Sequence, residues 1–186
     1  MTIKQRRIFF GLPGAGKSTL FNMIFGEATF HAHGKFKKNG ITYVECPRID
    51  SVADLNKFSN ETAEYVRKGG FFQLFFVVTL EKGKFNPVTW KVVHSIVDAI
   101  GDKNVPVSVI LNKVSPSTYR AMKDEETRRT FEDRILEGEG LNVTNIYYYI
   151  RQEGLFDEEE VRVGKLQDGF EEFLNTAIGF ETVPYE

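Results

Sequence analysis

Cysteine, net charge and long apolar runs are scarce in this sequence, and each scarcity excludes a class of protein. Cys46 is the single cysteine in 186 residues, so no internal disulfide can form and we expect a reducing, intracellular environment. The 24 Lys and Arg residues nearly balance 26 Asp and Glu residues, so no strong field draws the protein onto nucleic acid or an anionic membrane. The longest apolar run, residues 71–80, is about half of the roughly 20 residues that a membrane-spanning helix needs.

Targeting and anchoring patterns are scarce as well. The segment "MTIKQRR" is charged and precedes no signal-like apolar stretch, and "ETVPYE" has neither a cysteine box nor a hydrophobic tail. We therefore expect cytoplasmic localisation without a stable membrane anchor. The length suits one hydrophobic core, so residues 1–186 are expected to form a single domain.

Strand-like and helix-like segments alternate along the whole sequence. This alternation predicts a three-layer α/β fold with a mostly parallel, six-stranded sheet. The pair Asn39-Gly40 suits a tight type I′ hairpin turn, so one antiparallel edge strand is expected. The predicted strands are 3–10, 35–38, 41–46, 71–80, 105–112 and 142–150. The predicted helices are 17–25, 53–68, 87–100, 115–140 and 164–178.

A glycine-rich segment, "GLPGAGKST", joins the first predicted strand to the first helix. It satisfies G-x-x-x-x-G-K-[ST] in the strand-to-helix context that makes the pattern specific. In such a loop the backbone N–H groups surround phosphate oxygens, Lys17 reaches the β- and γ-phosphates, and the Ser18 hydroxyl can ligate magnesium. Lys17 is the candidate catalytic residue. The expected phosphate-binding residues are Gly11, Pro13, Gly14, Ala15, Gly16, Lys17, Ser18 and Thr19.

A second motif, "NKVS", stands at the end of the fifth predicted strand, where α/β sheets bind ligands. It resembles the N-K-x-D guanine-binding motif of the translation-factor-related GTPases. In that family the Asn braces the phosphate loop, the Lys stem lies on the base, and the Asp accepts hydrogen bonds from guanine. Ser115 replaces the Asp, so the resemblance implies weak base selectivity, because a charged acceptor becomes a neutral hydroxyl. The expected base-binding residues are Asn112, Lys113, Ser115 and Arg151.

Arg151 follows the last predicted strand, where such GTPases have a short base-contacting loop. Either Arg151 or Tyr149 could stack on a purine there, and an ordinary surface position fits Arg151 equally well.

The segment "ECPR", Glu45 to Arg48, is similar to the D-x-x-G motif, written "DTPG" in septins and in immunity-associated GTPases of the GIMAP (AIG1) type. The resemblance implies a P-loop G domain that binds GTP or GDP with Mg²⁺, which Ser18 and Glu45 would hold. Arg48 replaces the glycine whose backbone N–H meets the γ-phosphate. The alternative is that Glu45 simply ends an edge strand.

The connection before this motif is short. Only 26 residues separate Ser18 from Glu45, and the twelve-residue hairpin from Lys35 to Cys46 occupies the end of this stretch, which leaves little room for a switch loop. Thr29, the available threonine, lies close to the first helix and is a poor magnesium ligand. We therefore expect slow GTP hydrolysis or none. A second copy or a protein partner is expected on the side of the switch region.

Two other functions stay open. The chain could be a pseudo-GTPase, a nucleotide-binding interaction module whose nucleotide supports the fold, or, less favoured, a small P-loop kinase with "ETRRTFEDR" as its lid. His31 and His33 have the spacing of a metal-binding pair on a strand. No third ligand stands nearby, so a chance pair is the favoured interpretation.

Overall fold

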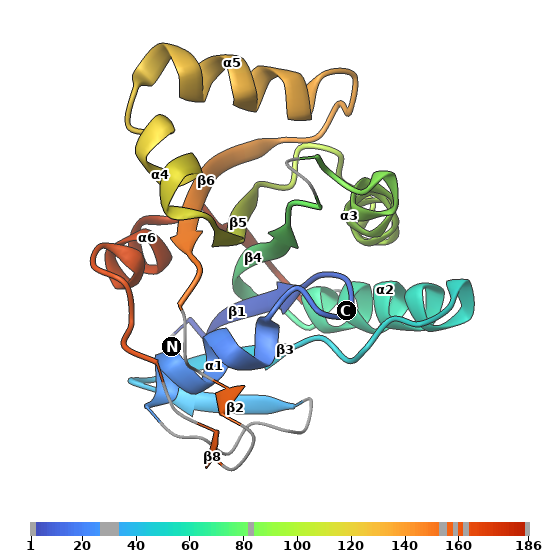
Figure 1. Ribbon diagram of the computed structural model, residues 1–186. Coiled ribbons are helices and arrows are strands. Elements are labelled where there is room, and N and C mark those ends of the chain that lie inside the picture. The colour runs from blue at the N-terminus through green and yellow to red at the C-terminus, as the bar shows by residue number, and fades with distance from the viewer. Residues whose placement is uncertain are drawn as a thin grey trace.

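The computed structural model describes residues 3–26, 34–81, 84–152, 156–157, 160–161 and 164–184. Helices cover both faces of a central sheet, as the sequence predicted (Figure 1). The helices are α1 Lys17–Phe25, α2 Val52–Arg67, α3 Pro87–Ile100, α4 Pro116–Ala121, α5 Glu125–Leu136 and α6 Phe170–Thr176. The strands of the sheet are β1 Gln5–Phe10, β2 Lys35–Lys38, β3 Ile41–Glu45, β4 Gly70–Thr79, β5 Val107–Val114, β6 Val143–Ile150 and β9 Phe180–Thr182.

The sheet has the order β2-β3-β1-β4-β5-β6. Strands β3, β1, β4, β5 and β6 are parallel, whereas β2 pairs antiparallel with β3 at one edge. Asn39 and Gly40 both have positive φ, 51° and 78°, which confirms the expected hairpin turn. A short hairpin of β7 Phe156–Asp157 and β8 Glu160–Val161 forms a separate two-stranded sheet.

The phenylalanines of β4 divide between two cores. Strand residues alternate between faces, so Phe72 and Phe76 pack in the core beneath α2 and α3, while Phe75 packs in the core beneath α1 and α6. A strand that is apolar on both faces belongs in the interior of a parallel sheet, and β4 lies between β1 and β5. The parallel order brings the carboxyl ends of these strands to one edge.

The prediction of one long helix over 115–140 is wrong. The chain forms α4, turns, and starts α5 at a new N-cap, where the Asp124 carboxylate accepts a hydrogen bond from the Thr127 N–H at 2.8 Å. The side chain of Met122, at the end of α4, packs against the cluster formed by Leu111, Val114 and Tyr148. A second helix cap and an apolar anchor therefore divide the charged segment.

The last elements also differ from expectation. Helix α6 begins at Phe170 rather than near 164, because Gly169 takes the left-handed conformation (φ 83°) and Gln167 bonds to β6. Strand β9 was not predicted. It pairs antiparallel with the start of β4, with Phe180 stacked on Phe72 at 5.8 Å between ring centroids.

Arg6 and Arg7 of β1 are both buried, and Arg7 is the more deeply buried of the two. The guanidinium of Arg7, 2% exposed, donates to Gln73 Oε1 and the Tyr43 hydroxyl at 2.9 and 2.8 Å, and to Asn175 Oδ1 at 2.9 Å. All three acceptors are neutral. Arg7 thereby links β1, β3, β4 and α6 at the end of the sheet away from the carboxyl edge.

Among the described residues, no helix is both long and apolar enough to cross a membrane.

Candidate functional site

The phosphate-loop residues lie where the sequence placed them, between the carboxyl end of β1 and α1. Gly14 has φ 79° and Gly16 has φ 91°, in the left-handed region that favours glycine. A Cβ at Gly16 would lie 2.4 Å from Asn112 Nδ2, and one at Gly11 would lie 2.2 Å from the Val77 carbonyl oxygen. Any larger residue at Gly11 or Gly16 would push the loop away from β4 or β5.

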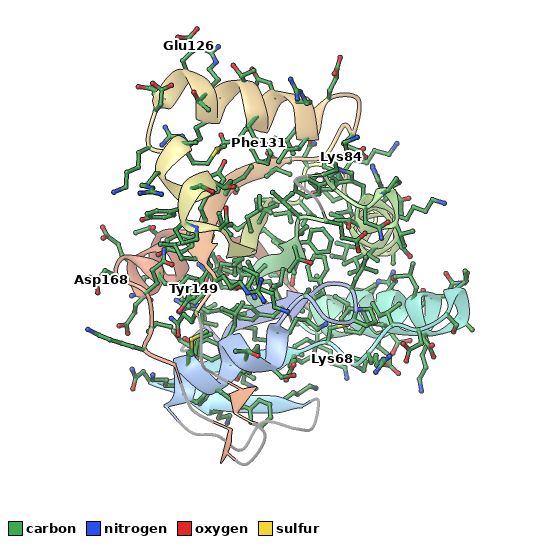
Figure 2. All side chains as sticks on the ribbon, viewed as in Figure 1. Lys68, Lys84, Glu126, Phe131, Tyr149 and Asp168 are labelled. Carbon is green, nitrogen blue, oxygen red and sulfur yellow. The ribbon has the colours of Figure 1, made fainter. Side chains whose placement is uncertain are left out.

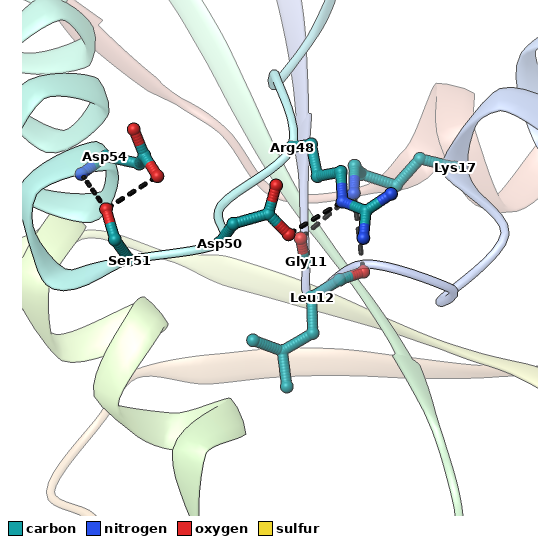
Figure 3. Close-up of polar contacts among 7 residues, drawn as sticks. All are labelled: Gly11, Leu12, Lys17, Arg48, Asp50, Ser51 and Asp54. Carbon is teal, nitrogen blue, oxygen red and sulfur yellow. Dashed lines mark hydrogen bonds and ion pairs between the residues drawn. The ribbon is translucent and has the colours of Figure 1, made fainter.

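Lys17 is the buried cation of this loop. Its side chain is 7% exposed, and its Nζ donates to the Gly11 carbonyl at 3.0 Å and approaches the Leu12 carbonyl at 3.5 Å (Figure 3). Burial lowers the pKa of Lys17, and the nearby Glu45 carboxylate opposes that effect. Within the described part of the chain, Lys17 makes no ion pair with a carboxylate. An ammonium held by neutral carbonyls is suited to receive an anion.

Ser18 and Glu45 bring two oxygen ligands together beside Lys17. The Ser18 hydroxyl donates to Glu45 Oε1 at 2.7 Å, and Glu45 is 3% exposed at the end of β3. A hydroxyl and a carboxylate are hard oxygen donors of the kind that Mg²⁺ prefers. The expected metal pair therefore offers two neighbouring oxygen donors of the type that a magnesium ion prefers. Thr19 follows, half-buried, in the first turn of α1.

The Asn-Lys pair of β5 holds the phosphate loop directly. Asn112 Nδ2 donates to the Ala15 carbonyl at 2.8 Å, and Lys113 Nζ donates to the Gly14 carbonyl at 2.9 Å. Asn112 is buried, whereas Lys113 is exposed and adopts a left-handed conformation, with φ 58°. Two side chains that lie about 100 residues beyond the loop in sequence therefore determine the positions of its carbonyl groups.

Ser115 and Arg151 lie next to one another at the same edge. Arg151 donates its backbone N–H to the Val114 carbonyl at 2.9 Å, which places the end of β6 beside the start of α4. Both side chains are exposed. The Ser115 hydroxyl accepts from the Thr118 N–H at 3.1 Å and so caps α4. The four expected base-binding residues thus occupy one end of β5 and β6.

Tyr149 does not lie in this group, so its assignment as a stacking candidate is wrong. Its ring is 1% exposed, and its hydroxyl donates to Met23 Sδ at 3.3 Å and accepts from the Gln167 N–H at 3.0 Å. Strand alternation turns Tyr149 into the core beneath α1 and α6.

Arg48 is exposed beyond Glu45. Its Nε donates to Asp50 Oδ1 at 2.7 Å, with side-chain exposures of 68% and 56% (Figure 3). Asp50 precedes the N-cap of α2, where Ser51 Oγ accepts from the Asp54 N–H. Cys46, between Glu45 and Arg48 in the chain, is fully buried, and burial raises the pKa of its thiol. Thr29, His31 and His33 lie outside the described residues.

A hollow on the other side of the phosphate loop was not foreseen. It has a volume of 260 Å³ and lies between the loop and the start of α3. Its polar lining comes from Thr79, Glu81, Asn86 and Thr89. Asn86 is the N-cap of α3, and its distance from the loop depends on how β4 and α3 are packed.

Comparison with solved structures shows the fold. Toc33 from Arabidopsis thaliana in complex with GDP and Mg²⁺ matches with a TM-score of 0.51 and 14% identity, over 87% of this chain and 76% of that chain. A bacterial selenocysteine-specific elongation factor, EF-Sec, matches with a TM-score of 0.56 and 15% identity, over 94% of this chain and 28% of that chain. A GTP-binding protein from Sulfolobus solfataricus in complex with GDP matches with a TM-score of 0.50 and 16% identity, over 77% of this chain and 46% of that chain.

The chain spans about half the length of the first solved structures it matches, 49% and 46%. No family model and no curated protein matches the sequence. Identities this low establish the fold alone, and membership of the GIMAP or septin branch stays a prediction. The chain has the three-layer α/β fold of P-loop G domains, with Lys17, Ser18 and Glu45 assembled at the carboxyl edge of its sheet.

Proposed function

We propose that this chain binds a guanine nucleotide, GTP or GDP, with magnesium. The observation that carries the proposal is the contact between the Asn-Lys pair and the phosphate loop. Asn112 and Lys113 bond to the carbonyls of Ala15 and Gly14, so the residues expected at the base and those expected at the phosphates form one continuous site. One nucleotide that spans both ends explains why the two motifs are joined.

Each residue then has a definite task at the phosphates. Lys17 would exchange its carbonyl partners for β- and γ-phosphate oxygens, which restores a full charge partner to a buried ammonium. Ser18 and Glu45 would hold magnesium, directly or through a bound water, and the ion supplies charge neutralisation at the phosphate oxygens. Backbone N–H groups of the loop and of the first turn of α1 would bind the remaining oxygens.

Hydrolysis in this proposal is slow or absent. Arg48 occupies the position at which the related motif has glycine, and it is paired with Asp50. The segment between α1 and β2 is short, from Gly26 to Gly34. A chain that binds GTP and GDP equally well, with no change in conformation, would be the pseudo-GTPase alternative, because a ligand without differential affinity shifts no equilibrium.

The resemblance of "ECPR" and "NKVS" to the corresponding motifs supports a place near the GIMAP and septin-like G domains. A second copy or a protein partner would then approach from the switch-region side. The kinase alternative loses support because its lid candidate lies in α5, a regular helix whose Phe131 packs in the cluster with Tyr148.

Isothermal titration of the purified chain with GDP, GTP, ADP and ATP, each with and without Mg²⁺, tests the proposal. We expect GDP and GTP to bind with magnesium, Lys17→Ala to abolish binding, and the matched variant Lys57→Ala, an exposed lysine of α2, to leave binding unchanged. Absence of binding to every nucleotide would refute the proposal. Phosphoryl transfer from ATP to a nucleoside monophosphate would instead establish the kinase alternative.

A further inference from the structure

Strand β6 is the outer strand of the sheet, and its free edge forms the floor of a groove. β6 follows β5 at the end of the strand order, and no other strand of the described chain pairs with it. A cavity of 690 Å³ is lined by six successive residues of this strand, 143–148. Successive strand residues point to opposite faces, so a cavity that contacts all six must lie along the edge itself.

The hydrogen bonds of β6 show which backbone groups face the groove. On the inner side, the Arg151 N–H bonds to β5 through the Val114 carbonyl. On the outer side, the Ile150 N–H and the Tyr148 carbonyl bond to the side chain of Gln167 at 2.7 and 3.0 Å. Backbone groups alternate in direction along a strand, so the N–H and C=O of Ile146 face outward as well. For these two groups no hydrogen bond is found within the described residues.

The contacts of Gln167 therefore indicate that this edge of β6 binds groups arranged as in a neighbouring strand. Its amide accepts from one residue of β6 and donates to a residue two positions earlier, which is the pattern that a neighbouring strand would provide. The amide covers only the last part of the strand. The part centred on Ile146 keeps the row of donors and acceptors to which a further strand can pair.

The walls of the groove select a single peptide rather than a second sheet. Helices α4 and α5 rise on one side and Asp168 stands on the other (Figures 1 and 2), and Gln167, next to Asp168 in the chain, also lines the groove. Because the edge is recessed between these walls, the matching walls of a second copy would prevent its sheet from reaching the edge. An extended peptide is narrow enough to enter.

The charges of the α4 and α5 wall specify the peptide further. Lys123 and Arg128 line the groove, and neither forms an ion pair with a carboxylate of the described residues. Glu132, on the same wall, accepts a hydrogen bond from the Tyr148 hydroxyl at 2.7 Å and is thereby held against the strand. An acidic side chain that points from the peptide toward this wall would meet the two cations.

We propose that the free edge of β6 binds an extended peptide of a partner protein, which adds a strand beside Ile146 and directs an acidic side chain toward Lys123 and Arg128. The site is distinct from the nucleotide site and does not depend on the proposed function. Main-chain hydrogen bonds supply the affinity, and Lys123 and Arg128 supply the preference for an acidic peptide.

The experiment is selection of a random 12-residue peptide library, displayed on phage, against the immobilised full chain. Selected peptides are then synthesised and titrated by fluorescence polarisation. We expect Asp or Glu in the selected peptides and at least ten-fold weaker binding to Ile146→Pro, which lacks the outward N–H but suits an edge strand. Ile146→Val keeps the N–H and should bind within two-fold of the wild type. Lys123→Glu should weaken binding about ten-fold, whereas Lys91→Glu, an exposed lysine of α3, should have no effect.

Hydrogen exchange on the wild-type chain tests the same contact without a substitution, and so covers the case in which Ile146→Pro fails to fold. Bound peptide should slow exchange at the Ile146 amide. Failure to select any peptide, binding that leaves exchange at Ile146 unchanged, or a dimer in sedimentation that Ile146→Pro dissociates would overturn the proposal. The dimer would identify a second copy as the occupant.

Discussion

The substitution Ser115→Asp should increase the preference for guanine over adenine without loss of stability. The Ser115 hydroxyl caps α4 by accepting from the Thr118 N–H, and aspartate is an equally good N-cap. The added charge lies at a helix N-terminus, where it is favourable. A hydrogen bond to a charged group contributes about 1.5 to 3 kcal/mol. Since about 1.4 kcal/mol corresponds to a factor of ten, the ratio of GDP to ADP affinity should rise about 10- to 100-fold.

Competitive titration of the wild type and the variant with GDP, ADP and inosine diphosphate measures this ratio. Inosine diphosphate lacks the 2-amino group of guanine and should gain less than GDP. Ser117→Asp is the matched control, because it adds the same charge to the same exposed turn, two residues further along. Its GDP to ADP ratio should equal that of the wild type.

The reasoning fails if Ser115→Asp binds nucleotide normally and its GDP to ADP ratio does not change. That result would mean that the base does not lie beside the start of α4, and the expected roles of Ser115 and Arg151 would fall with it. An equal rise in Ser117→Asp would show that long-range charge, rather than a contact with guanine, is responsible.

Three further outcomes are expected. Arg48→Gly should speed phosphate release from GTP at least ten-fold and cost less than about 1 kcal/mol of stability, because the lost pair with Asp50 is exposed; an unchanged rate would contradict this. Arg7→Lys should lower the free energy of unfolding in urea by about 2 to 3 kcal/mol, because one ammonium nitrogen cannot reach the three separate acceptors that the planar guanidinium spans, and a loss below about 0.5 kcal/mol would count against that account. Burial lowers the pKa of Lys17 in the folded chain below its ordinary value of 10.5. Between the lowered pKa and 10.5 the unfolded chain therefore binds more protons than the folded chain, so the free energy of unfolding rises with pH. Lys17→Met should remove this rise from nucleotide-free protein in urea titrations at successive pH values, and an identical slope in both proteins would show that Lys17 is not its source.

Local turn and cap chemistry explains why much of the fold could be predicted. Asn39-Gly40 produces the hairpin, Gly26 ends α1 with φ 72°, and Asn86 and Gly101 bound α3. Each of these effects arises within a few residues of the position that causes it. The glycines of the phosphate loop likewise permit its turns locally, whereas the distant Asn112 and Lys113 hold its carbonyl groups in place.

The parts that escaped prediction depend on contacts between distant segments. Strand β9 has three residues, and it is held by Phe180 on Phe72 and by the Thr182 hydroxyl, which donates to the Val66 carbonyl at 2.6 Å. Tyr149 was misassigned because neighbouring residues of a strand point to opposite faces, so a shift of one position moves a side chain from the site into the core. No local pattern carries this information.

In the candidate site, too, local motifs could be recognised in the sequence, whereas contacts between distant segments could not. The residue types at its two ends were recognised from their motifs, and the structure brings them together. The pairing of Arg48 with Asp50 and the hollow beside Asn86 were not foreseen, because each depends on the path of a loop between elements.

The hydrogen bonds from β5 to the phosphate loop would affect the release of the proposed nucleotide. Because Asn112 and Lys113 already hold the Ala15 and Gly14 carbonyls, the loop is preorganised, and a ligand need not bear the entropic cost of ordering it. The same bonds couple the two halves of the site mechanically. A factor that accelerates exchange of the proposed nucleotide would therefore act most effectively by separating Lys113 from Gly14, which would weaken the binding of its base and its phosphates together.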